Sequence, residues 1–108
     1  MPHRIHVREL KAMLDAGKPV MLLDVREPAE HAICHLPGSE LIPLGELPVR
    51  LNEIHPPDGG LVVVYCHHGI RSLSGAAYLE QAGVTPVASL SGGIDAWSAL
   101  IDPSVPRY

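Results

Sequence analysis

The segment 61-LVVVYCHHGIRS-72 passes from an apolar, β-branched run through a glycine-containing loop into a helical pattern. The turn-forming residues PPDGG precede it at 56–60 and indicate where a strand begins. Because the run at 61–65 has no polar alternation, it is typical of a parallel sheet that is covered on both faces. The helical pattern runs from Ser72 to Ala82 and ends at Gly83, so we predict a strand, a short loop and a helix here.

The same alternation of strands and helices extends along the rest of the chain. Apolar runs at 20–23 and 87–90 predict two further strands, and two short flanking strands are expected at Ile5 and at Leu41-Ile42. Four other helices are predicted. The first covers Leu10 to Leu14 with Gly17 as C-terminal cap, and the second begins near Pro28. The third runs from Pro48 to Ile54, and the last follows Gly92-Gly93. This order predicts one α/β domain over residues 1–108, with an ordered core at about 4–101 and a frayed tail at 102–108.

Composition and charge narrow the class of protein. Of the 108 residues, 46% are hydrophobic and 19% are charged, so a packed core is expected without metal or disulfide support. The net charge is −4 and the basic residues are scattered, which argues against a nucleic-acid-binding surface. No apolar run approaches the roughly 20 residues of a membrane span, and the first ten residues lack a signal-peptide pattern. We therefore expect a cytoplasmic protein with reduced thiols.

The chain contains two cysteines and seven histidines, which are residue types that can form disulfides or bind metal ions. Two thiols, Cys34 and Cys66, are too few for a disulfide framework or a four-cysteine zinc site. Cys66, His67 and His68 are adjacent, and adjacent residues rarely all turn to one ion. The prediction is therefore no metal site and no cofactor.

Cys66 lies where an open α/β sheet places its ligands, beyond the carboxyl end of a strand. If the following loop curls, its backbone N–H groups form an anion-binding nest, and the next helix adds the positive end of its dipole. Gly69 permits the curl through a positive φ, and Arg71 brings a permanent positive charge. These effects favour the thiolate, which is the nucleophilic form. The alternative is that Cys66 is a small buried hydrophobic residue.

Four ordered segments carry a resemblance to a known family. They are CHHGIRS at 66–72, LDVREPAE at 23–30, HLPGSELIP at 35–43 and LSGGIDAW at 90–97. Together they resemble the motifs of rhodanese-like sulfurtransferases along nearly the whole chain, and the length is similar to that of the short single-domain thiosulfate sulfurtransferases. The resemblance implies one rhodanese-like domain: a five-stranded, mainly parallel sheet with helices on both faces.

The resemblance also implies a ping-pong reaction at Cys66. Its thiolate attacks the outer sulfur of a donor such as thiosulfate, releases sulfite, and passes the sulfur from a persulfide to cyanide or a cellular thiol, which a protein could carry. The anions would be held by the field of Arg71 and by loop N–H groups. The expected substrate-binding residues are His67, His68, Gly69, Ile70, Arg71 and Ser72. His67 and His68 are expected to be surface imidazoles without a proton-transfer role.

Two rival functions follow from the same segment. Tyrosine-phosphatase-like enzymes use a loop with five residues between cysteine and arginine, whereas four separate Cys66 from Arg71. A shorter loop suits a single sulfur better than a phosphate, so phosphatase or arsenate reductase chemistry ranks lower. The other rival is a catalytically quiet rhodanese-like module that binds a partner protein or senses redox state.

The chain departs from the family pattern at two positions. His31 replaces the usual aromatic residue, and Cys34 replaces the usual glycine, which indicates that φ at position 34 is not strictly positive. A lone buried thiol is the favoured interpretation of Cys34; the alternative is that it resolves a Cys66 persulfide or forms a disulfide with Cys66. Trp97 is expected in the core and Ser91 is a candidate helix N-cap. A local ion-pair network is expected among Asp24, Arg26, Glu27 and Glu30.

Overall fold

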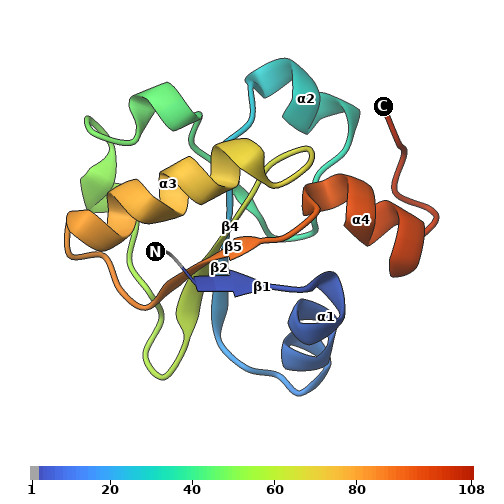
Figure 1. Cartoon of the computed structure of the whole chain (residues 1–108), viewed down its shortest axis with the longest axis horizontal. Coiled ribbons are helices and arrows are strands. Elements are labelled where there is room, and N and C mark those ends of the chain that lie inside the picture. Colours follow the sequence, from blue (N-terminus) through green and yellow to red (C-terminus); the bar gives the residue numbers. More distant parts are fainter. Residues whose placement is uncertain (1–2) are drawn as a thin grey trace.

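Five strands pair in parallel into one sheet, in the order β1-β5-β4-β2-β3 (Figure 1). The structure is a computed structural model and describes residues 3–108. The strands are β1 His3–Ile5, β2 Val20–Asp24, β3 Glu40–Leu41, β4 Leu61–Tyr65 and β5 Val87–Leu90. The predicted α/β fold with a five-stranded parallel sheet is therefore confirmed, including both short flanking strands.

Four α-helices cover the sheet: α1 Val7–Asp15, α2 Pro28–Ile33, α3 Ile70–Gln81 and α4 Gly93–Leu100. In Figure 1, α3 crosses above the sheet, whereas α1 lies below it. Helix α1 ends near the predicted position, but its C-cap is Ala16, and Gly17 with a φ of +72° follows that cap. Helix α3 begins two residues before the predicted start. In α4 the N-cap is Gly92, so the prediction that Ser91 caps this helix is wrong.

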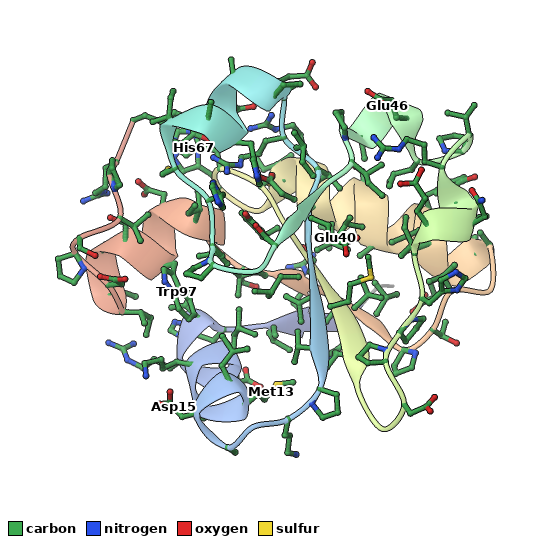
Figure 2. The ribbon with its side chains drawn as sticks, turned by 180° about the vertical axis from the view of Figure 1, so that it is seen from behind. Met13, Asp15, Glu40, Glu46, His67 and Trp97 are labelled. Atoms are coloured by element: carbon green, nitrogen blue, oxygen red, sulfur yellow. The ribbon has the colours of Figure 1, made fainter. Side chains whose placement is uncertain are left out.

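The middle strand β4 is covered on both faces, as its uninterrupted apolar run predicts. Val63 and Tyr65 join an apolar cluster with residues of α1 and α4, whereas Val62 and Val64 join a second cluster with residues of α3. Alternate strand residues point to opposite faces, so the two clusters lie on opposite sides of the sheet. Trp97 is 7% exposed in the first cluster and lies between α4 and α1 (Figure 2), as predicted for a core residue.

The predicted helix from Pro48 to Ile54 is not formed. Two separate 3₁₀ turns, Leu44–Glu46 and Leu51–Glu53, occupy this part of the chain. Leu47 and Ile54 follow these turns and are both buried, at 1% and 2% exposure. Two tight turns bring both side chains into the core next to α3, and this packing overrides the local helical preference.

The tail at 102–108 packs against the domain, in contrast to the expected fraying. The Ser98 hydroxyl donates a hydrogen bond to the carbonyl of Val105, and Arg107 forms a two-point ion pair with Asp95. The Tyr108 hydroxyl reaches back to residues that follow β2. These partners are far apart in sequence, which is why local propensity did not indicate them. Within residues 3–108, no helix is both long and apolar enough to cross a membrane.

Candidate active site

Cys66 lies directly after β4, between the carboxyl ends of β2 and β5. Its side chain is 1% exposed and belongs to the apolar cluster on the α3 side of the sheet. The loop at 66–69 is held against α4, because the amides of Ile94 and Asp95 donate to the carbonyls of Cys66 and His67 at 2.9 and 3.1 Å. A side chain at Gly93 would overlap the Cys66 carbonyl, so this close approach requires glycine.

The loop curls so that two backbone amides point at the Cys66 sulfur. The N–H groups of Gly69 and Ser72 lie 3.1 and 3.3 Å from Sγ. Gly69 adopts a φ of +98°, which confirms the predicted left-handed conformation and turns its amide inward. Donors aimed at one sulfur stabilise negative charge on it, and the amino-terminal end of α3 adds to this effect. The arrangement is chemically suited to holding a thiolate or a persulfide anion.

A pair of buried hydroxyls completes the surroundings of the sulfur. Ser72 Oγ lies 3.5 Å from Cys66 Sγ and 2.8 Å from Ser89 Oγ, and both serines are almost fully buried. When Cys66 is ionised, Ser72 can donate to the sulfur while it accepts from Ser89. Sequence reasoning included Ser72 for its backbone amide but missed the hydroxyl and missed Ser89. The available signal was a polar residue inside the apolar run 87–90.

Arg71 lies in the first turn of α3 and not in the loop before it, where it was predicted, and its charge is shared with an acidic partner. Its guanidinium donates two hydrogen bonds to the Glu30 carboxylate, at 2.6 and 3.0 Å. These bonds lower the pKa of Glu30 to about 2 and raise the pKa of Arg71. Arg71 directly precedes Ser72, whose amide points at the Cys66 sulfur, so the ion pair adjoins the loop that surrounds the sulfur. The pair as a whole adds little net charge.

His67 and His68 differ in their exposure. His68 is exposed, as predicted, and its Nε2 lies 3.9 Å from an oxygen of Asp95. His67 is only partly exposed, because its ring is stacked between His68 and Tyr108 with centroid distances of 3.8 and 3.9 Å. Burial lowers the pKa of His67, so its neutral form is favoured. His67 is therefore less exposed than His68; Figure 2 shows His67 at the end of the molecule that carries α2.

His67, His68 and Asp95 are the one set of metal-type donors that the described residues bring within 4.8 Å of one another. The two imidazole rings are stacked on each other, and His68 Nε2 lies 3.9 Å from an oxygen of Asp95. Both oxygens of Asp95 already accept hydrogen bonds from Arg107. These contacts make Asp95 the centre of a small ion-pair cluster.

Ile70 and Arg4 lie beside an open cavity of about 290 Å³ next to the loop. The Ile70 side chain is 79% exposed, which is unusual for a large apolar residue. The cavity is also lined by His68, Gly69, Leu73, Ser89, Ser91 and Gly92. The loop residues expected to bind substrate therefore differ in what they contact. Ser72 contacts the sulfur, His68 and Ile70 line the cavity outside it, and Gly69 does both.

The predicted ion-pair network after β2 exists, but it separates into parts. Arg26 and Asp24 form a fully buried pair, in which the guanidinium donates to both carboxylate oxygens. His31 Nδ1 lies 2.8 Å from the same carboxylate, so the residue that departs from the family pattern takes part in this network. Glu27 caps α2, and its backbone amide donates to Glu30. Arg26 also donates to the carbonyl of Cys34 and thereby holds the segment after α2.

Cys34 is a free, buried thiol with a φ of −163°, which confirms that position 34 does not need a positive φ. Its side chain belongs to the apolar cluster that contains Tyr65, whereas Cys66 belongs to the cluster on the opposite side of the sheet. No disulfide joins the two cysteines. The direct bridge between them has no support in this arrangement.

Comparison with known proteins identifies the class that this fold and loop define. The sequence matches the rhodanese-like domain family over residues 6–100, and the chain belongs to that family. It is 39% identical over 98 residues to a sulfurtransferase of Allochromatium vinosum, covering 91% of this chain and 90% of that protein. The predicted membership of the rhodanese-like sulfurtransferases is confirmed.

Larger proteins contain a similar unit. The chain is 36% identical over 101 residues to the probable adenylyltransferase/sulfurtransferase MoeZ of Mycobacterium tuberculosis, covering 94% of this chain but 26% of that protein. It therefore spans about a quarter of the length of this relative. Thiosulfate sulfurtransferase from Pseudomonas aeruginosa superimposes with a TM-score of 0.81 at 32% identity, over 91% of this chain and 19% of that chain.

Proposed function

We propose that the protein transfers sulfane sulfur from thiosulfate, or from a persulfide donor, to a thiophilic acceptor through a persulfide on Cys66. The observation that carries this proposal is the pair of amides, from Gly69 and Ser72, that point at the Cys66 sulfur. The same donors serve the thiolate before transfer and the persulfide anion after it. The names of the sulfurtransferase relatives support the same chemistry.

The proposed reaction has two half-reactions at one sulfur. The Cys66 thiolate attacks the outer sulfur of thiosulfate, a new S–S bond forms, and the bond to the sulfite group breaks. Sulfite leaves with the electron pair of that bond. The total charge of −3 is conserved, because thiolate and thiosulfate become persulfide anion and sulfite. An acceptor nucleophile, cyanide or a thiolate, then attacks the outer sulfur and the Cys66 thiolate leaves. Neither half-reaction needs a cofactor or an external oxidant.

The acceptor and the compartment also belong to the proposal. A protein thiol is a reasonable acceptor, because the exposed side chain of Ile70 provides an apolar contact beside the loop. A reducing compartment such as the cytoplasm would keep both cysteines as thiols between turnovers. Phosphatase chemistry is disfavoured, because Glu30 already occupies the guanidinium that would bind a phosphate.

Mass spectrometry of the intact protein after treatment with thiosulfate tests the proposal. We expect a gain of about 32 Da, one sulfur atom, which disappears with dithiothreitol. Cys66→Ser should abolish the gain, and the matched variant Cys34→Ala should retain it. If the wild-type protein acquired no sulfur and formed no thiocyanate, the quiet binding module would become the better hypothesis. If the turnover of an aryl phosphate exceeded that of thiosulfate with cyanide, phosphatase activity would become the better hypothesis.

A further inference from the structure

Glu30 pairs with Arg71, the charged side chain next to the loop that surrounds Cys66. Its carboxylate accepts both guanidinium hydrogen bonds, and the two side chains are 19% and 37% exposed, so the pair borders solvent. Arg71 directly precedes Ser72, whose amide lies 3.3 Å from the Cys66 sulfur, so without this partner the loop would carry an unbalanced positive charge. The acidic side chain comes from α2 and the basic one from α3, 41 positions later, so only the fold brings them together.

Glu30 is held in place by more than its ion pair. Oε1 accepts from Arg71 and from the backbone amide of Glu27, and Oε2 accepts from Arg71 and from the hydroxyl of Tyr108. Tyr108 itself accepts a hydrogen bond from the buried Arg26 at 2.8 Å. Four donors on one carboxylate fix its position and keep it ionised. The negative charge of Glu30 is therefore a permanent feature of the surroundings of Arg71.

We propose that Glu30 is a specificity-determining residue that lowers the preference of the Cys66 site for doubly charged sulfur donors relative to singly charged ones. The physical reason is that the energy of an anion in the field of a fixed charge is proportional to the charge of the anion. Removal of one negative charge should therefore raise kcat/KM for both kinds of donor. The factor for a dianionic donor should be about the square of the factor for a monoanionic donor. This inference rests on the proposed sulfur transfer through Cys66.

The experiment compares two donors with one acceptor, cyanide. Thiosulfate is a dianion and benzenethiosulfonate is a monoanion, and both deliver one sulfane sulfur. In a ping-pong reaction, kcat/KM for the donor reports only the half-reaction that loads Cys66. In Glu30→Gln, an isosteric change, we expect kcat/KM to rise about threefold for benzenethiosulfonate and about tenfold for thiosulfate at low ionic strength. Added salt should reduce the difference between the two donors.

Two further variants separate charge from structure. Glu30→Asp keeps the charge while it alters the hydrogen bonds, so its donor ratio should remain close to that of the wild type. Glu53→Gln removes a carboxylate that pairs with Arg50 in the second 3₁₀ turn, and it should leave both donors unchanged. If Glu30→Gln changed both donors by the same factor, or if Glu30→Asp behaved like Glu30→Gln, the inference would be overturned while the proposed function stood. If the wild-type protein took sulfur from neither donor, the proposed function itself would fail.

Discussion

At the scale of single residues, the arrangement around Cys66 separates two tasks. The sulfur is held by uncharged donors, the amides of Gly69 and Ser72 and the Ser72 hydroxyl. The full charges of Arg71 and Glu30 lie further out and balance each other. Uncharged donors stabilise an anion without binding it so strongly that it cannot react onward. The outer ion pair is then available to select among donors.

The ion pair between Glu30 and Arg71 makes the stability of the protein depend on pH. Hydrogen bonds from Arg71 lower the pKa of Glu30 from 4.5 to about 2 in the folded state. A carboxyl group with a lowered folded pKa contributes stability above its unfolded pKa, and this contribution is lost as the pH falls towards its folded pKa. We expect Glu30→Gln to reduce the free energy of unfolding by about 1–2 kcal/mol near neutral pH, after allowance for solvent screening.

Urea unfolding at a series of pH values checks this prediction. The difference between the wild type and Glu30→Gln should be constant above about pH 5 and should shrink between pH 4.5 and pH 2. A difference of the same size at every pH would show that Glu30 acts only by packing and hydrogen bonding in either protonation state.

At the scale of elements, the site is the junction of a strand, a loop and two helices. Strand β4 ends at the loop, α3 begins at Ile70 with its positive end towards the sulfur, and the start of α4 binds two loop carbonyls. This junction leaves no room for a side chain at Gly69. An added Cβ would lie 3.0 Å from the amide nitrogen of Gly92 and 3.2 Å from the carbonyl oxygen of Leu90.

Gly69→Ala should therefore disturb the loop more than a glycine-to-alanine substitution at another position with a positive φ. We expect it to destabilise the fold by about 1–3 kcal/mol and to slow alkylation of Cys66 by iodoacetamide at neutral pH, because the amide moves away from the sulfur. The matched control is Gly83→Ala, which has a φ of +86° but no heavy atom within 4 Å of an added Cβ. Equal alkylation rates in the two variants and the wild type would contradict the assigned role of the Gly69 amide.

At the scale of the whole molecule, the tail ties together elements that are far apart in sequence. Tyr108 contacts Arg26 after β2, Glu30 in α2 and His67 in the active-site loop. Its ring covers one face of His67, and burial is the largest cause of the lowered pKa of that imidazole. The tail is thus part of the surroundings of the site, although it follows the last helix.

Replacement of Tyr108 by alanine should release His67 from this environment. We expect the pKa of His67 to rise towards that of an ordinary histidine, because its charged form is again solvated. Titration of the imidazole signals by NMR measures the change directly. Tyr108→Phe keeps the stacked ring and should keep the pKa low, so an equal rise in both variants would contradict a role for the ring.

Most of the sheet, the main helices and the position of Cys66 were predictable from local patterns. Apolar runs, turn residues and Gly69 act within a few positions of the chain, and their physical preferences do not depend on distant partners. The predicted 48–54 helix failed because burial of Leu47 and Ile54 outweighed local propensity.

The tertiary structure alone decided which side chains meet. It pairs Glu30 with Arg71, joins Ser72 to Ser89, places Tyr108 over His67 and separates Cys34 from Cys66. Such contacts depend on strand order and on how helices lie across the sheet, which no short window of sequence contains. The cysteine and its loop are thus properties of the local sequence, whereas the charge that surrounds them is a property of the folded chain.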